Sequence, residues 1–459
     1  MLSSGKMCLL PRGWLRYSLP AFLFLCLVFG NLRAVGEHYV FAHYMVCFAT
    51  YGESIQAFQR EIREAQAGGI DGFALDVGAW SGPDTYYKKR VQSMFDAAQS
   101  LRSNFKLFFS LEITNTTDIV QMVMDYSGHT NMFRQNGKVV LSTYGQNSVD
   151  WSNSVFQPLA KQGVGVFFVP HFWPEPVQEL PSYTDGLNIL NKYGGLVDGL
   201  FLFGGAGLPS QLAQCNSNYN RAVHVNGKLF MASVTPHYWG CSQLTIGRRY
   251  FEFDGGEGLQ LQWRSIIANQ PEWVEIVTWN DFNESTYISP VDDPGNYFAG
   301  LQTPRRYSHK GYLELSKHFI TWYKTGKEPV TANDALFAFY RTHPKDALAL
   351  NTNDVPVTWR MGNVQDALHA SALLSSPGQL VIASGNNFTT NSLPAGLSNV
   401  KVTFSPGVQK MTLRRNNTNV VSVQGPDIQT SIQLYDFFPA TAFAKTSPEA
   451  PEILRVSGQ

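Results

Sequence analysis

The chain of 459 residues carries little charge: 15% of its residues are Asp, Glu, Lys or Arg, and 35 basic residues balance 35 acidic ones. Such a balance gives no electrostatic footprint for nucleic acid or for an anionic membrane surface, so we expect neither as a partner. Aromatic residues are plentiful instead, with 31 Phe, 20 Tyr and 10 Trp. This composition suits a neutral ligand such as a polysaccharide, although it also suits any large, well-packed domain.

Long apolar runs are scarce as well. One lies near the N-terminus, where Lys6, Arg12 and Arg16 precede the apolar stretch 19–30 and a small residue, Ala34, follows it. The stretch is too short to span a bilayer comfortably, and this order of segments is typical of a secretory signal peptide, with an uncleaved anchor as the alternative. The C-terminus has no hydrophobic tail of the kind that precedes a lipid anchor. We therefore predict a signal peptide at residues 1–34 and a secreted protein, extracellular or in the cell wall, with no membrane association after cleavage.

Cysteines are few: five in the chain, of which Cys8 and Cys26 fall within the predicted signal peptide. An oxidising destination permits one disulfide, and we predict that Cys215 pairs with Cys241, since both lie in loop-like sequence. Cys47 is then expected to be a buried free thiol.

Glycosylation acceptor motifs of the form Asn-x-Ser/Thr occur at four positions. We expect glycans at Asn115, Asn387 and Asn416. The fourth, Asn283, lies within a proposed active-site loop and is expected to be shielded.

Several motifs of enzyme chemistry are missing. There is no Gly-x-Ser-x-Gly elbow for an esterase and no compact metal motif such as His-Glu-x-x-His. No Gly-rich phosphate turn follows the first predicted strand, which weakens a doubly wound, nucleotide-binding sheet. We expect no metal and no cofactor.

Short apolar strands alternate with amphipathic helices from residue 39 onward, which predicts parallel strand–helix units. Eight such pairs within 35–328 fit a (β/α)8 TIM-like barrel, with a doubly wound open sheet as the alternative. A helix near 250–269 leads to the eighth strand. Residues 329–459 show only short strands separated by Asn, Gly and Pro turns and are predicted to form an all-β sandwich, which either binds carbohydrate or buttresses the barrel.

The stretch 273–290 is the most informative. A buried strand at its start breaks into a loop that carries two carboxylates, Asp281 and Glu284, three residues apart and flanked by aromatic residues. Paired carboxylates perform the acid and base steps of glycoside hydrolysis. Carboxylates in a polar loop are also common as solvated turn or capping residues, so this alternative stays open.

Residues at the carboxyl ends of barrel strands face the active site. We therefore expect polar groups and aromatic faces there to bind sugar. The candidates are His43, Asp76, Trp80, Glu112, Tyr144, His171, Trp173, His237, Tyr238, Trp239, Trp279, Asn280 and Tyr287.

Residues 279–285, Trp-Asn-Asp-Phe-Asn-Glu-Ser, followed by Tyr287 and Ile288, resemble the Trp-Asn-Asp-aromatic-x-Glu-Ser signature of glycoside hydrolase family 71, the fungal α-1,3-glucanases or mutanases. Residues 40–46 are similar to the first strand of that family, and residues 69–76 to its second. The resemblance runs from residue 39 or so to the C-terminus.

The resemblance implies a glucan endo-1,3-α-glucosidase that cleaves fungal cell-wall α-1,3-glucan (mutan) with inversion. Inversion requires the two carboxyl groups to lie about 6.5–9.5 Å apart, so that a water fits between them. We assign Glu284 as the acid and Asp281 as the base, with Asp76 or Glu112 as alternatives for one role. Two other hypotheses stay open: a related barrel hydrolase of another glycan, and a catalytically silent wall-glucan-binding protein. The expected partner is the polysaccharide, and the protein is expected to be a monomer.

Overall fold

The computed structural model of the chain describes residues 38–83, 86–244, 247–293, 297–298 and 301–446. The predicted signal peptide, 1–34, lies outside these residues. Within the described ranges, none of the helices combines the length and the apolar character that a bilayer crossing requires.

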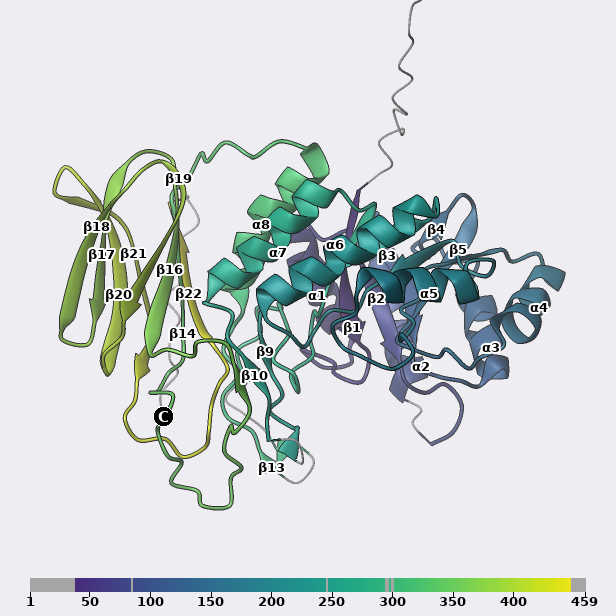
Figure 1. Cartoon of the computed structure of the whole chain (residues 1–459), viewed down its shortest axis with the longest axis horizontal. Coiled ribbons are helices and arrows are strands. Elements are labelled where there is room, and N and C mark those ends of the chain that lie inside the picture. The colour runs from purple at the N-terminus through teal and green to yellow at the C-terminus, as the bar shows by residue number, and fades with distance from the viewer. Residues whose placement is uncertain (1–37, 84–85, 245–246, 294–296, 299–300, 447–459) are drawn as a thin grey trace, which may run out of the picture. The chain divides into compact units, whose positions relative to one another are not determined.

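The first part of the described chain is built on one curled, mostly parallel sheet (Figure 1). Its parallel strands are, in spatial order, β6 (Val166–Phe168), β5 (Lys138–Thr143), β3 (Lys106–Leu111), β2 (Gly72–Val77), β1 (Tyr39–Met45), β11 (Trp273–Ile276), β8 (Leu229–Val234) and β7 (Gly199–Phe201). A short strand, β4 (Arg134–Gln135), pairs antiparallel with β5. At the two ends of the parallel order, the backbone amides of Asp198 and Phe201 donate to the carbonyls of Phe168 and Pro170, each at 2.9 Å. The mixed α/β fold predicted from the sequence is confirmed.

Helices follow most of these strands. They are α1 (Ile55–Ala67), α2 (Tyr86–Ser100), α3 (Thr116–Tyr126), the π-helix η1 (Ser152–Phe156), α4 (Gln157–Lys161), α5 (Tyr183–Tyr193), α6 (Pro209–Val225), α7 (Gly256–Asn269) and α8 (Lys310–Thr325). Helix α1 shows why they form: the Ser54 hydroxyl caps its first turn by accepting from the amide of Ala57, and Phe58 and Ile62 recur on its buried face.

Side chains of successive strand residues point to opposite faces of the sheet, and this alternation positions the active site. On β1, Val40, Ala42 and Tyr44 belong to the large apolar cluster beneath the helices. Phe41 instead joins an inner cluster with Phe108 and Trp273. The inner positions become polar toward the carboxyl end of each strand, so polar groups gather at one end of the curled sheet.

The C-terminal part is all β, as predicted. One sheet has the order β19 (Gly396–Thr403), β16 (Ala367–Leu374), β14 (Ala335–Tyr340), β22 (Ala440–Lys445), and the other β18 (Asn387–Leu393), β17 (Gly378–Ser384), β20 (Gly407–Arg415), β21 (Thr418–Ile428) (Figure 1). Every pairing in both sheets is antiparallel. The two sheets share one buried apolar cluster, to which Leu336 and Leu368 contribute from one sheet and Ile382 and Leu413 from the other.

A small third sheet joins segments far apart in the sequence. It has the order β15 (Arg360–Met361), β10 (Tyr250–Phe251), β9 (Tyr238–Trp239). A separate short hairpin pairs β12 (Tyr297–Phe298) with β13 (Leu301–Gln302). Because β15 follows β14 in the chain, a segment of the C-terminal part lies against the loops that follow β8.

The predicted disulfide between Cys215 and Cys241 is wrong. Both residues are free thiols, as is Cys47. Cys215 lies within helix α6 and packs in the large apolar cluster. Cys241 lies after β9, where its thiol donates to the carbonyl of Phe282 at 3.4 Å. The sequence predicts a loop around Cys215, whereas the residue lies in helix α6 and its thiol is buried in apolar packing.

Candidate active site

A buried imidazole lies at the centre of the polar end of the curled sheet. His43 of β1 shares a hydrogen bond of 2.7 Å between its Nδ1 and Oε1 of Glu275 on the neighbouring strand β11. Its Nε2 lies 3.9 Å from Oδ1 of Asp76 on β2, the other neighbour. Burial opposes protonation of His43, but the hydrogen bond and charge of Glu275, together with Asp76 and Glu112, outweigh it and raise the histidine pKa. The imidazole therefore favours its charged form between carboxylates.

Asp76 and Glu112 extend this group along the sheet. Burial and the charge of Glu112 raise the pKa of Asp76 well above its ordinary value, and His43 offsets part of the rise. Partial removal from water raises the pKa of Glu112, which His43 lowers in part and Asp281 raises further. Since each carboxylate disfavours the ionisation of the next, the cluster resists carrying a negative charge on every member.

The loop after β11 is anchored from below by two residues with no access to solvent. The Asn280 side chain accepts from the amide of Met45 at 2.8 Å and donates to the carbonyls of Met45 and Phe48. The Trp279 indole donates to Glu61 at 2.8 Å, inside the large apolar cluster. Trp279 and Asn280, both predicted to bind sugar, are fully buried and hold the loop in place.

Asp281 is buried at the start of this loop. Its amide donates to the Thr278 hydroxyl at 2.7 Å, and its Oδ1 accepts from the amides of Asn283 at 2.9 Å and Glu284 at 3.1 Å. Burial raises the pKa of Asp281, while these two amides and His43 oppose the rise. The amides favour the ionised form of Asp281 and so offset part of the effect of burial.

Glu284 has a different environment. Its Oε1 accepts from the Tyr238 hydroxyl at 2.9 Å and from the Gln243 amide at 3.0 Å. Burial raises the pKa of Glu284 to about 8, with the charge of Asp281 adding to the rise; Tyr238 and Arg249 lower it in part. The carboxyl therefore holds its proton at neutral pH, as a general acid must.

An outer ring of polar side chains fixes Tyr238. Arg249 donates to the Tyr238 hydroxyl at 3.0 Å and to the Gln243 side chain at 3.2 Å. The same guanidinium forms a bidentate ion pair with Glu179, at 2.8 and 2.7 Å. Tyr238, predicted to bind substrate, thus lies at the site and contacts Glu284, the predicted acid.

Aromatic rings from the segments that follow β5, β6 and β7 gather beside the carboxyl groups of the candidate site. Tyr144 packs on His171 with ring centroids 5.7 Å apart, on Trp173 at 5.6 Å and on Phe203 at 4.7 Å. Burial, followed by the charges of Glu284 and Glu112, raises the pKa of Tyr144, which places its hydroxyl within the field of both. Burial lowers the pKa of His171 to about 4, so this imidazole is neutral. Tyr144 and Trp173 are half-buried and keep an open edge for a sugar.

Four other predicted sugar-binding residues are buried elsewhere. They are Trp80, His237, Trp239 and Tyr287. His237 bonds to the Ser285 hydroxyl at 3.0 Å, and Tyr287 stacks on His309 with centroids 3.8 Å apart. Trp239 packs against Phe437 and Phe438, and Trp80 packs against Tyr126. Each of these four side chains is enclosed by the protein, and sugar binding by them stays a prediction.

The predicted glycan acceptors Asn115, Asn387 and Asn416 are all exposed. Asn115 also caps helix α3 by accepting from the amides of Thr117 and Asp118. Glycosylation itself stays a prediction.

Residues with no sequence signal complete the site: Glu179, Gln243, Arg249, Glu275 and Phe203. Glu275 occupies an inner position of β11, and Phe203 lies two residues after β7; both follow from the alternation once the register is known. Gln243 and Arg249 lie in the loop before α7. The sequence predicts a helix near 250–269, whereas α7 begins at Gly256. Glu179 lies in an irregular segment, where no period predicts which side chains meet.

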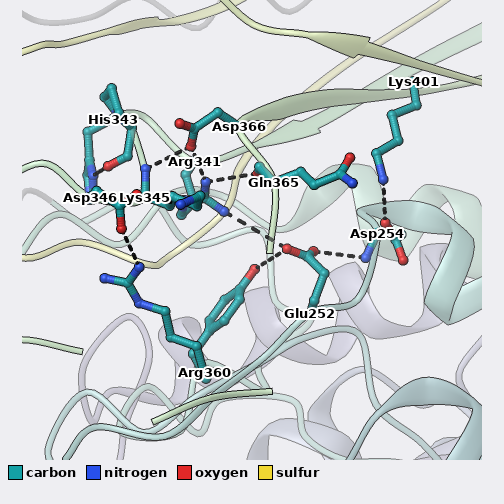
Figure 2. Close-up of polar contacts among 12 residues, drawn as sticks. Glu252, Asp254, Arg341, His343, Lys345, Asp346, Arg360, Gln365, Asp366 and Lys401 are labelled. Atoms are coloured by element: carbon teal, nitrogen blue, oxygen red, sulfur yellow. Dashed lines mark hydrogen bonds and ion pairs between the residues drawn. The ribbon is translucent and has the colours of Figure 1, made fainter. Parts of the chain in front are cut away.

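Ligand-type side chains meet at one further place in the described part of the chain. Glu252, Asp254 and His369 bring ligand atoms within 4.8 Å of one another. Arg341 already lies 4.0 Å from Glu252, and Lys401 pairs with Asp254 at 3.0 Å (Figure 2). These two cations neutralise the carboxylates, so the group needs no metal ion to be stable.

A carboxyl that keeps its proton, a second one held by backbone amides and a group of aromatic rings beside them are the parts of a site for glycoside hydrolysis. The comparison with protein families agrees with this class. The model of Glycosyl hydrolase family 71 matches residues 36–451, and the chain belongs to that family. The resemblance noted in the sequence is confirmed.

Similar proteins carry matching names. The chain is 28% identical to a glucan endo-1,3-alpha-glucosidase of Schizosaccharomyces pombe, over 90% of this chain and 97% of that protein. It is 27% identical to a mutanase of Penicillium rubens, over 87% of each. An ascus wall endo-1,3-alpha-glucanase of S. pombe is 26% identical over 87% of this chain and 95% of its own length. Among solved structures, an endo-alpha-mannosidase from Bacteroides thetaiotaomicron aligns with a TM-score of 0.47 at 15% identity, over 62% of this chain and 98% of its own.

Proposed function

We propose that this glycoside hydrolase cleaves internal α-1,3-glucosidic bonds of fungal cell-wall α-1,3-glucan. The names of three relatives that align over most of their own length support the substrate. The observation that carries the reaction is the contrast between Glu284, whose pKa burial and Asp281 raise to about 8, and Asp281, whose Oδ1 accepts two backbone amides.

In the proposed mechanism Glu284 protonates the glycosidic oxygen as the bond to the anomeric carbon breaks. Asp281 takes a proton from a water that attacks the anomeric carbon from the opposite face, so the configuration inverts. Tyr238 and Gln243 orient the Glu284 carboxyl and stabilise it once it is ionised. Tyr144 and Trp173 provide apolar faces for the sugar ring.

The architecture proposed around this site is a closed (β/α)8 barrel over residues 35–328 and a β-sandwich over 329–459. The backbone bonds between Asp198, Phe201 and the end of β6 support closure of the barrel. We further propose that residues 1–34 are a signal peptide, that the protein is secreted to the cell wall or the medium, and that Asn115, Asn387 and Asn416 carry glycans. The enzyme is proposed to act as a monomer.

The test is incubation of the secreted protein with insoluble α-1,3-glucan, with reducing ends and product anomers followed by NMR. The parent is expected to release oligosaccharides with an initial β-anomer, and Glu284→Gln to release almost none. Glu175→Gln is the matched control, since Glu175 is an exposed partner of Lys192. Turnover of β-1,3-glucan or mannan in place of α-1,3-glucan would assign a different substrate, and an initial α-anomer would contradict inversion.

A further inference from the structure

Trp359 stands out among the tryptophans. It is 44% exposed and is the only exposed tryptophan in the described residues. It belongs to the C-terminal part of the chain and directly precedes β15. An exposed indole offers a large apolar face to a ligand.

The position of Trp359 relative to the acid is defined by one guanidinium. The Cζ of Arg249 lies 5.5 Å from the centre of the Trp359 ring and also 5.5 Å from the centre of the Tyr238 ring. Tyr238 in turn donates to Glu284 at 2.9 Å. The exposed ring is thus connected to the general acid through two intervening side chains, while Arg249 covers only part of it.

The segment that carries Trp359 is firmly held. The Trp359 carbonyl accepts from the amide of Tyr250 at 2.8 Å. The next residue, Arg360, pairs with Asp346 at 2.8 Å, and both are drawn in Figure 2. The amide of Thr358 donates to the carbonyl of Gly247 at 3.1 Å. The indole is therefore presented by a fixed backbone and loses little conformational freedom on binding a ligand.

Contacts on the other side of this segment fix it to the α/β part. Arg248 donates to the carbonyl of Val355 at 2.9 Å and pairs with Asp354 at 2.8 Å, with both side chains buried. Arg341 lies between Glu252 and Asp366 (Figure 2). Both ends of the segment are thus tied to the loops that hold Tyr238.

We propose that Trp359 is a stacking platform for a glucose residue of the bound glucan, at a subsite beyond the two sugars that flank the cleaved bond. The proposal rests on the proposed function, because the ligand is the glucan chain itself. It gives the C-terminal part a direct role in substrate binding. An indole that is partly exposed, held on a fixed backbone and linked through Arg249 and Tyr238 to Glu284 suits the apolar face of a pyranose ring.

The experiment compares the parent with Trp359→Ala, Trp359→Phe and Phe388→Ala on α-1,3-gluco-oligosaccharides of increasing length. Phe388 is the matched control, because it is an aromatic residue 72% exposed on β18 of the C-terminal part. With long oligosaccharides, Trp359→Ala is expected to raise KM by up to about tenfold with kcat little changed, and Trp359→Phe to restore most of the affinity. Short substrates that do not reach the platform are expected to be cleaved equally by all four proteins.

Equal KM values for the parent and Trp359→Ala on every length would overturn the platform while leaving the hydrolase intact. A parent with no turnover of any α-1,3-glucan would overturn the proposed function. In that case, calorimetric titration of the parent and Trp359→Ala with the longest oligosaccharide decides on Trp359 separately: equal affinity, or no binding to either, contradicts the platform.

Discussion

The candidate active site has two sides that are built in different ways. On the strand side, His43, Asp76, Glu112 and Glu275 come from neighbouring strands or the residue just after one, and gather several carboxyls around one imidazole. On the loop side, donors surround a single carboxyl, that of Glu284: Tyr238 and Gln243 directly, and Arg249 behind them. The two sides therefore differ in how their carboxyl groups hold protons.

On the strand side, several carboxyl groups and His43 influence one another's charge, whereas on the loop side Glu284 alone retains a proton. The charge of Glu112 raises the pKa of Asp76, the charge of Asp281 raises that of Glu112, and His43 lowers both. Glu284 lacks an adjacent imidazole, and burial together with Asp281 raises its pKa to about 8. Asp281 lies between the two sides, since it affects the pKa of Glu112 and of Glu284.

The largest expected effect is that of Asp281→Asn. Removing the base that activates water is expected to lower kcat by about 10²–10⁴-fold, the usual contribution of a positioned acid or base. Asn keeps a side-chain oxygen that can accept the two backbone amides, so the loop is expected to keep its conformation. The measurement is kcat on α-1,3-gluco-oligosaccharide, with the melting temperature as the folding control. If Asp281→Asn keeps near-parental kcat while Asp76→Asn loses it, the base belongs to the strand side.

An intermediate effect concerns pH. Because the pKa of Glu284 is raised to about 8, kcat/KM is expected to fall as pH rises through that value and the acid loses its proton. Stability follows the same group: the folded carboxyl keeps its proton to a higher pH than the unfolded one, whose ordinary pKa is 4.5. The parent is therefore expected to lose stability relative to Glu284→Gln as pH rises from about 4.5 to about 8.

Melting temperatures of both proteins across this range provide the measurement. If the difference in melting temperature between the two proteins does not change with pH, Glu284 does not retain its proton. The distinction between the strand side and the loop side would then fail.

The smallest expected effect is on the strand side. Glu275→Gln removes the charge that helps to raise the pKa of His43, so that pKa is expected to fall. The readout is an NMR titration of the imidazole resonances. His129, whose pKa burial lowers at a distant site near Phe95, is the internal reference and should not move. An unchanged His43 titration would mean that Asp76 and Glu112 alone set its charge.

The sequence predicted the strand side better than the loop side, for a physical reason. His43, Asp76 and Glu112 lie at or just after strand ends, and a period of two fixes which residues point inward. No such period governs the loops. Gln243 contacts Glu284 directly, and Arg249 and Glu179 lie behind it, through tertiary contacts between segments about 35–105 residues away along the chain. No pattern in the sequence indicates these contacts.

The burial of the aromatic residues near the loop has a related cause. Trp239, Trp279 and Tyr287 flank the loop in sequence, but large apolar side chains gain more by burial than by contact with substrate. The aromatic rings nearest to the two carboxylates in sequence therefore pack in the interior, where they support the loop. The ring that we propose meets the glucan, Trp359, lies 75 residues beyond Glu284.

The pairing of β15 with β10 has a consequence for the order of synthesis. Residues 38–325 contain every strand and helix of the curled sheet, yet the strand that supports Tyr238 and Trp239 through β10 is not translated until residue 361. Strand β14 must also wait for β22, which ends at Lys445, to complete its sheet. A nascent chain can thus assemble the cluster around His43 early, but a shortened gene product that stops after α8 lacks β15, the strand that supports Tyr238 through β10.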